Sequence, residues 1–278
     1  MSDCKIKNME NLEKLDVSVI LPIDSANNVM FNDLFNRAII SIQTQTKPIN
    51  ELVIVHSGEE LLKNTLDNFD FSGLTVTLVE NENEFDFCSQ INIGVKHAKS
   101  NWISILEFDD EYSTIWFKNF DRYEKAYPEV DAFLPIVIDT DEKGVFVGFT
   151  NEATFAVSMN SEIGYLNNDT LLNYQNFQSS GMVIRKSVFE DNGGFKPSMK
   201  LTFVYEYLLR LTYNSVKIMT IPRIGYKHMN LRPGSIFWKY KNGESKITDD
   251  EVSFWIESAK KEHFFTTDRN IKFEPQSV

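Results

Sequence analysis

Apolar residues in this chain fall into short continuous runs and longer stripes of helical period. The runs are rich in β-branched residues and predict buried strands over residues 17–23, 51–55, 74–79 and 102–108. The stripes predict helices over residues 32–45, 59–69, 86–98 and 114–126, each after a strand. This alternation predicts an α/β fold built from right-handed βαβ units, with a mostly parallel central sheet and helices on both faces.

The pattern changes after Asp131. Strands over residues 131–138 and 145–149 predict a hairpin, and residues 151–178 have weak periodicity, as expected of loops with one short helix. Helices are predicted over residues 187–191 and 202–213, and strands over residues 216–221 and 224–229. Thr248-Asp-Asp-Glu251 is a capping-box pattern that starts a C-terminal helix. We therefore divide the chain into a polar leader (1–16), an α/β domain (17–230, with halves 17–112 and 113–230) and a helical C-terminal extension (231–278).

Composition narrows the classes of function. The net charge of -12 and the pI near 4.9 argue against a nucleic-acid partner, because such proteins carry a basic face. No apolar stretch has the length of a transmembrane segment, and residues 1–16 lack the apolar core of a signal peptide. The two cysteines, Cys4 and Cys88, make no disulfide framework. We expect a cytoplasmic protein, with peripheral membrane association as an alternative.

Carboxylates cluster where the strand over residues 102–108 ends. Glu107, Asp109, Asp110 and Glu111 lie within five positions. Ligands of open α/β sheets bind beyond the carboxyl ends of the strands, and clustered carboxylates repel one another unless a cation neutralises them. The pattern predicts a divalent-cation site, for Mn²⁺ or Mg²⁺, that holds a phosphorylated substrate. An acidic surface turn is the alternative in a chain with 40 Asp and Glu residues.

Short motifs recur in a fixed order along most of the chain. They are Val17-Ser-Val-Ile-Leu-Pro22, Ser41-Ile-Gln-Thr-Gln45, Glu51-Leu-Val-Ile-Val55, Ile91-Asn-Ile-Gly94, Leu106-Glu-Phe-Asp-Asp110, Gly181-Met-Val-Ile-Arg185, Gly193-Gly-Phe195, Leu209-Arg-Leu211 and Arg232-Pro-Gly-Ser235. This order resembles the inverting family 2 of the GT-A-fold glycosyltransferases. The resemblance implies a GT-A (nucleotide-diphospho-sugar transferase) fold. It also implies transfer of a sugar, with inversion, from a nucleotide-diphosphate donor to a glycan or lipid-linked acceptor, a UDP-sugar being favoured.

The resemblance also implies roles for particular residues. Asp109 stands in the DxD motif as the direct metal ligand, and His228 is a candidate further ligand, with a packed histidine as the alternative. Glu107 and Asp110 would support the metal or reach the ribose, although Asp110 also suits a helix N-terminus. The nucleotide and donor-binding candidates are Pro22, Ile23, Asp24, His56, Ser57, Asn92, Glu107 and Asp110.

Two segments depart from the family pattern. The family has Asp-Asp-Gly-Ser after its second strand, whereas this chain has His56-Ser-Gly-Glu59, so the carboxylate expected to accept the uracil N–H is missing. The Glu-Asp pair that holds the family's catalytic base falls on Phe203-Val204. The nearest carboxylate, Glu206, is therefore the candidate base. The alternatives are that Glu206 pairs with Arg210 at i,i+4, or that the base comes from residues 152–162.

These departures leave a second class of function open. A non-catalytic GT-A-like domain that binds a nucleotide or glycan through a degenerate site would also fit them. Nucleotidyltransferases and NAD-dependent oxidoreductases are disfavoured because residues 24–28 contain no glycine. The aromatic and basic segment Phe237-Trp-Lys-Tyr-Lys241 fits a solvated arm, a membrane surface or an anionic glycan.

Overall fold

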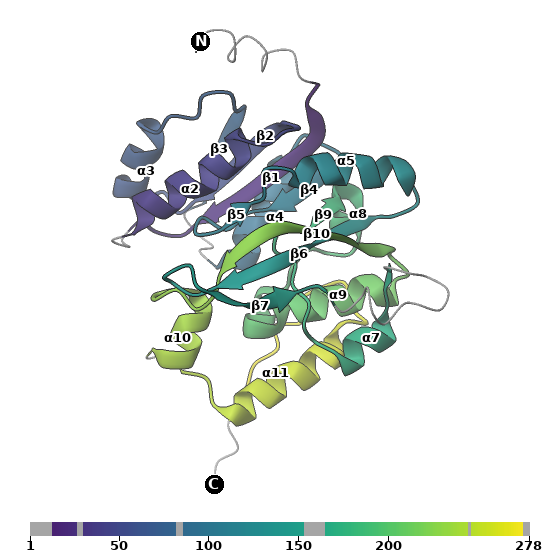
Figure 1. The fold of residues 1–278 in the computed structure, drawn as a ribbon. Helices are drawn as coiled ribbons and strands as arrows, with labels where there is room; N and C mark the ends of the chain where they lie inside the picture. The colour runs from purple at the N-terminus through teal and green to yellow at the C-terminus, as the bar shows by residue number, and fades with distance from the viewer. Residues whose placement is uncertain (1–12, 27–29, 82–85, 153–164, 244–245, 275–278) are drawn as a thin grey trace.

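The computed structural model describes residues 13–26, 30–81, 86–152, 165–243 and 246–274. A ten-stranded sheet runs through the molecule, with helices on both faces (Figure 1). Eight strands follow the order β3-β2-β1-β4-β9-β6-β10-β5, while β7 pairs with β6 and β8 pairs with β10. The α/β fold predicted from the sequence is confirmed.

The N-terminal half is a parallel β-sheet with helical crossovers. Its parallel strands are β1 (Leu15–Ile23), β2 (Ile49–His56), β3 (Val76–Glu80) and β4 (Trp102–Ile105). Its helices are α2 (Phe31–Gln43), α3 (Glu60–Asp67) and α4 (Phe87–His97). Each element overlaps the range that hydrophobic periodicity predicts. Strands β1, β2 and β4 are almost entirely buried and read as continuous apolar runs, whereas in β3 only Val79 is buried.

The C-terminal half makes the sheet mixed. Strand β9 lies antiparallel between β4 and β6, whereas β10 runs parallel to β6. The elements are β5 (Glu111–Tyr112), α5 (Trp116–Ala126), β6 (Ala132–Thr140), β7 (Phe146–Thr150), β8 (Tyr165–Leu166), α7 (Asn168–Asn173), β9 (Val183–Arg185), α8 (Lys186–Asp191), η1 (Pro197–Thr202), α9 (Phe203–Tyr213), β10 (Ile218–Met229), α10 (Ile236–Asn242) and α11 (Asp249–Glu262). The sheet is thus less parallel than the sequence pattern indicates.

Two predicted segments differ in detail. The strands expected over residues 216–221 and 224–229 form one strand, β10, with register shifts around Pro222, which lacks an N–H for the ladder. The loop region expected over residues 151–178 contains β8 and the short helix α7. Its residues 153–164 lie outside the described part of the chain.

The core has two layers, one on each side of the sheet. Alternate side chains of β1 enter different layers, so Val19 belongs to the layer that contains residues of α2 and α5, while Ile20 belongs to the layer that contains residues of α4 and α9. Trp116 of α5 and Trp255 of α11 are both fully buried. The predicted helix start is confirmed, because Thr248 is the N-cap and its Oγ1 accepts a hydrogen bond of 3.2 Å from Glu251 N. Helix α11 therefore packs onto the second half of the fold through Trp255.

Polar contacts fix the turn that follows β4. Ser41 Oγ, near the end of α2, accepts a hydrogen bond from Tyr112 N at 3.1 Å. Gln45 Nε2 donates to Ser113 O at 2.8 Å. The Ser41 to Gln45 motif thus holds the segment just after the acidic cluster, which lies at the carboxyl end of β4.

Candidate active site

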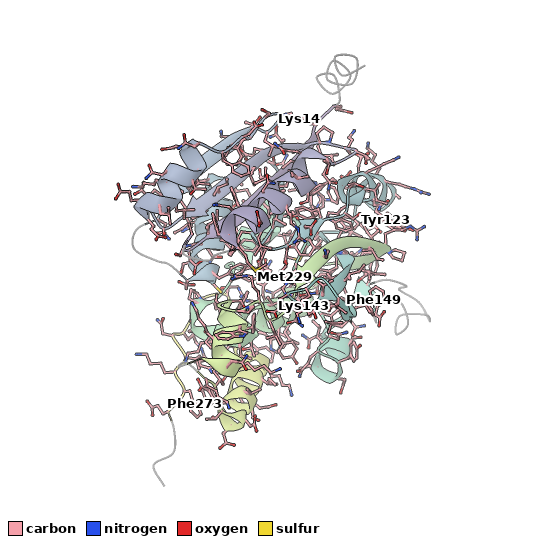
Figure 2. The ribbon with its side chains drawn as sticks, turned by 60° about the vertical axis from the view of Figure 1, so that its left-hand side comes forward. Lys14, Tyr123, Lys143, Phe149, Met229 and Phe273 are labelled. Carbon is pink, nitrogen blue, oxygen red and sulfur yellow. The ribbon has the colours of Figure 1, made fainter. Side chains whose placement is uncertain are left out.

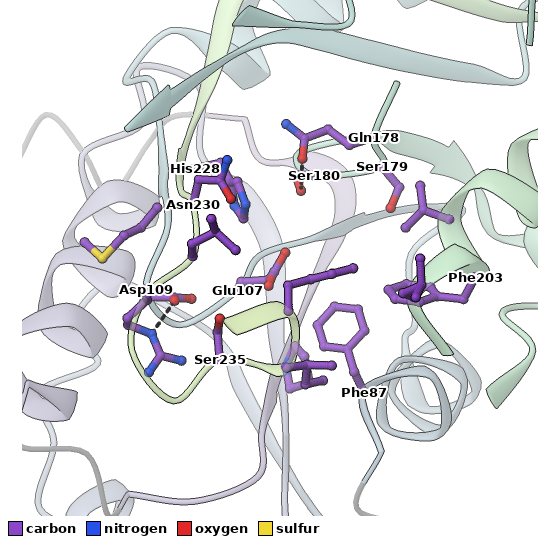
Figure 3. Close-up of a pocket in the computed structure, with 18 of the residues that line it drawn as sticks. Phe87, Glu107, Asp109, Gln178, Ser179, Ser180, Phe203, His228, Asn230 and Ser235 are labelled. Atoms are coloured by element: carbon purple, nitrogen blue, oxygen red, sulfur yellow. Dashed lines mark hydrogen bonds and ion pairs between the residues drawn. The ribbon is translucent and has the colours of Figure 1, made fainter. Parts of the chain in front are cut away.

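A pocket of about 790 Å³ opens beyond the carboxyl ends of β1 and β4. Its walls come from these strand ends, from α4, from the start of α9 and from the segment that joins β10 to α10 (Figure 3). Met229, the last residue of β10, lines the pocket and is labelled in Figure 2. The residues that line it include Pro22, Asp24, Phe87, Gln90, Glu107, Asp109, Gln178, Ser180, Leu201, Phe203, Val204, His228, Arg232, Ser235, Ile236, Phe237 and Lys239. The pocket lies where ligands of open α/β sheets bind.

Two carboxylates and one imidazole come together at the edge of this pocket: Glu107 and His228 line it, whereas Asp110 is buried and is not among the described lining residues. Ligand atoms of Glu107, Asp110 and His228 all lie within 4.8 Å of one another. The Asp110 carboxylate is hydrogen-bonded to His228 Nδ1 at 3.0 Å and accepts a hydrogen bond from Met229 N at 2.8 Å. The two carboxylates supply the oxygen donors that Mn²⁺ and Mg²⁺ prefer, and His228 would add one nitrogen donor. The cluster is therefore a candidate site for a divalent cation.

Asp109 has a different partner. Its Oδ2 accepts a hydrogen bond from Arg232 Nε at 2.5 Å (Figure 3), and only 9% of the Asp109 surface is exposed. The Arg232 guanidinium also lies 4.7 Å from the centre of the Phe108 ring. The cluster of acids thus already contains a fixed cation, and the sequence assigned no role to this arginine. Its place in the Arg232-Pro-Gly-Ser235 motif is the signal that could have pointed to it.

Burial and mutual repulsion shift the proton affinities of the cluster. Burial, and then the charge of Asp110, raise the pKa of Glu107 to about 8. The same two causes raise the pKa of Asp109. Burial disfavours the charged form of His228, but the neighbouring carboxylates, Asp110 first, outweigh it and raise the pKa of His228 to about 10. Near neutral pH, Glu107 and His228 therefore hold a proton when no cation is bound.

Binding of Mn²⁺ is accordingly expected to release protons and to weaken as the pH falls. Glu107 and His228 must each lose a proton to coordinate a cation, since ligands bind deprotonated. Affinity should fall roughly tenfold per pH unit for each proton released. Isothermal titration calorimetry in two buffers of different ionisation enthalpy measures the number of protons released when Mn²⁺ binds. Binding of Mn²⁺ without proton release would contradict coordination by this pair.

The donor-binding candidates from the sequence separate into two groups. Pro22 and Asp24 line the pocket. His56 is buried, and its Nδ1 accepts a hydrogen bond from Gly58 N at 3.2 Å. Asn92 links α4 to the turn at Gly193 and Gly194 (the glycine turn), because its side chain accepts from Phe195 N at 2.9 Å and donates to Phe195 O at 2.8 Å. None of the described lining residues is Ile23, His56, Ser57, Asn92 or Asp110, whereas Glu107 is among them.

Glu206 lies in the core and not among the described residues that line the pocket. It is fully buried, and its Oε2 accepts a hydrogen bond from Arg210 Nη2 at 2.7 Å. Its Oε1 lies 2.8 Å from Lys196 Nζ. Lys196 Nζ also donates to Glu262 O at 2.8 Å and to Phe265 O at 2.6 Å. The i,i+4 pairing with Arg210 is present, and this network ties α9 to the end of α11.

The family of the chain follows from comparison with known proteins. The family model described as Glycosyl transferase family 2 matches residues 18–193, and the chain therefore belongs to this family. Its fold and family make it a glycosyltransferase domain. A comparison with curated proteins found no match.

Solved structures of S. aureus TarS resemble the fold. The crystal structure of TarS has a TM-score of 0.58 at 14% identity and covers 92% of this chain and 44% of that one. TarS 1–349 in complex with UDP-GlcNAc has a TM-score of 0.59 at 15% identity, covering 90% and 73%. The complex with UDP has a TM-score of 0.58 at 14% identity, covering 90% and 72%. The chain thus spans less than half of the longer TarS chain.

Proposed function

We propose that this domain transfers a sugar, with inversion, from a nucleotide-diphosphate donor to a glycan or lipid-linked acceptor, assisted by a divalent cation. The observation that carries the proposal is the cluster of Glu107, Asp110 and His228, of which Glu107 and His228 line a pocket beyond β4. Membership of glycosyl transferase family 2 supports it. Inversion requires the acceptor oxygen to attack C1 of the sugar from the side opposite the leaving diphosphate.

Glu107, Asp110 and His228 would hold Mn²⁺ or Mg²⁺. When bound, the cation would neutralise the negative charge that develops on the leaving diphosphate. Asp109, expected from its DxD position to be the direct ligand, is paired with Arg232. We propose that Asp109 orients Arg232, whose guanidinium would bind diphosphate oxygens from the pocket wall.

A UDP-sugar is the favoured donor. TarS, a structural neighbour of this fold, has been solved with UDP and with UDP-GlcNAc. Asp24 lines the pocket and would contact the base or the ribose, with Pro22 beside it. His56 and Asn92 would support the donor site indirectly, because their side chains are hydrogen-bonded to the backbone at Gly58 N and Phe195 O.

We place the protein in the cytoplasm, with peripheral contact to a membrane as the route to a lipid-linked acceptor. Helices of the described residues include none that is long and apolar enough to cross a bilayer. The net charge of -12 gives the chain as a whole no attraction to nucleic acid.

Thermal unfolding with UDP, GDP, CMP and dTDP, each with and without Mn²⁺, tests the donor site. A ligand that binds only the folded state raises the melting temperature in proportion to its binding free energy. We expect UDP, at a concentration of about 100 times its Kd, to raise the melting temperature by several degrees, and only when Mn²⁺ is present. Equal stabilisation with and without Mn²⁺ would contradict the cation site, and stabilisation by none of the nucleotides would contradict the donor site.

A non-catalytic domain is the second candidate function. It is favoured by one observation, that the position of the family's Glu-Asp pair is occupied by Phe203 and Val204 while Glu206 is buried in a structural network. In that case nucleotide would bind, but neither transfer nor donor hydrolysis would occur. Release of UDP from UDP-GlcNAc or UDP-glucose, followed over hours, separates the two functions.

A further inference from the structure

The pocket has a charged end and an apolar end. Asp109 and its ion pair lie on the left in Figure 3, Glu107 lies near the centre, and Phe87 and Phe203 lie on the right. The apolar wall is formed by α4, η1, the first turn of α9, α10 and α11 through Phe87, Leu201, Phe203, Val204, Ile236, Phe237 and Ile256. A wall of this composition stabilises a ligand with an apolar part.

Ionisable acids are confined to the charged end. Among the described residues that line the pocket, the carboxylates are Asp24, Glu107 and Asp109. Asp24 follows β1, Glu107 belongs to the candidate cation cluster, and Asp109 is paired with Arg232. Glu206, two residues after Val204, is turned into the core. A sugar hydroxyl at the apolar end would meet no carboxylate from the described lining that is free to take its proton.

Helix α10 adds exposed apolar groups and a cation at the pocket. None of its residues, Ile236–Asn242, is buried. Phe237 is 45% exposed and Ile236 is 37% exposed, yet both line the pocket. Lys239, from the same helix, lines the pocket as well. An apolar surface beside an amine matches an anionic head group on an apolar chain.

We propose that the acceptor is a phosphate monoester carried by a long apolar chain. This inference rests on the proposed function and names the acceptor class. The second pKa of such a phosphate is about 6, so near neutral pH it is largely a dianion and needs no base. Its oxygen forms a bond to C1 of the sugar, and the bond from C1 to the nucleotide diphosphate breaks. The electron pair leaves with the diphosphate, the monoester becomes a diester, and no proton has to be removed.

Helices α10 and α9 would bind different parts of this acceptor. Lys239 binds the phosphate, while Phe237, Ile236 and the first turn of α9 bind the adjoining apolar chain. The replacement of the family's Glu-Asp pair by Phe203 and Val204 then enlarges the apolar wall and removes a base that this acceptor does not need.

Acceptor assays with the full chain test the proposal. UDP-sugars and Mn²⁺ are combined with a polyprenyl monophosphate, with phosphatidic acid in detergent, or with neutral glycans and free alcohols. We expect transfer to one of the two lipid phosphates, giving a product that mild acid cleaves at the glycosyl phosphate. The lipid phosphate that accepts the sugar faster shows which kind of lipid carries the acceptor phosphate. Transfer only to glycans or alcohols would overturn the inference and leave the proposed function standing, whereas absence of nucleotide binding would overturn both.

Matched variants locate the acceptor site. Lys239→Ala should raise the KM for the lipid phosphate about tenfold while leaving nucleotide affinity unchanged. Lys241→Ala, on the same helix but not among the lining residues, should change this KM less than about twofold. Phe237→Ser should raise the KM about tenfold for a long-chain phosphate but not for a short alkyl phosphate. Equal effects of the two lysine variants, or equal effects of Phe237→Ser on both chain lengths, would overturn the assignment.

Discussion

Asp110→Asn is expected to lower sugar transfer by about 100-fold or more and to abolish Mn²⁺-dependent nucleotide binding. The substitution keeps the shape of a side chain that is only 1% exposed, but it removes one of the two carboxylates of the Glu107, Asp110 and His228 cluster. The remaining donors would hold a hard cation weakly. Titration calorimetry of Mn²⁺ and of UDP, with a transfer assay, measures both effects.

A neighbouring acid provides the control for this variant. Glu111 pairs with Arg37 and Lys227 and is not part of the cluster, so Glu111→Gln should bind Mn²⁺ normally. Asp109→Asn separates two roles. If Asp109 orients Arg232, the variant keeps its Mn²⁺ affinity and loses nucleotide affinity. If Asp109 is a metal ligand, the variant loses both affinities. Unchanged Mn²⁺ binding in Asp110→Asn would rule out the proposed ligand set.

Glu206→Gln is expected to destabilise the protein by about 3–5 kcal/mol. The change leaves Arg210 and Lys196 buried without the carboxylate that balances them. Because these groups also hold Asn192 O, Gly194 O and the end of α11, their loss should loosen the glycine turn and the C-terminal helix together. Urea unfolding measures the free energy of unfolding.

The same variant separates a structural role from a catalytic one. Below its own melting temperature, Glu206→Gln should retain most of its transfer activity if the residue is structural. Lys196→Met in the same chain should recover part of the stability, since it removes one of the uncompensated charges. Glu190→Gln breaks an exposed i,i+4 pair with Lys186 and should cost less than about 1 kcal/mol. A stable Glu206→Gln protein without transfer activity would restore Glu206 as the base.

Hydrophobic periodicity located the N-terminal half of the fold because β1, β2 and β4 are almost entirely buried and each helix has one apolar face. It was less informative where β9 runs antiparallel between β4 and β6, since the direction of a strand depends on its neighbours and leaves no mark on its own residues. For the same reason, one bent strand, β10, appeared as two. Strand pairing is decided by the tertiary structure, because it joins segments that are far apart in the sequence.

The sequence by itself determined the family, the acidic turn after β4 and the absence of a Glu-Asp pair at Phe203 and Val204, because these depend on residue types in a fixed local order. Only the tertiary structure decided which side chains meet. It brought His228 from β10 to Asp110, paired Asp109 with Arg232, and turned Glu206 into the core beside Lys196. Each of these contacts joins charges whose interaction depends on distance and burial, and neither quantity is written in the local sequence.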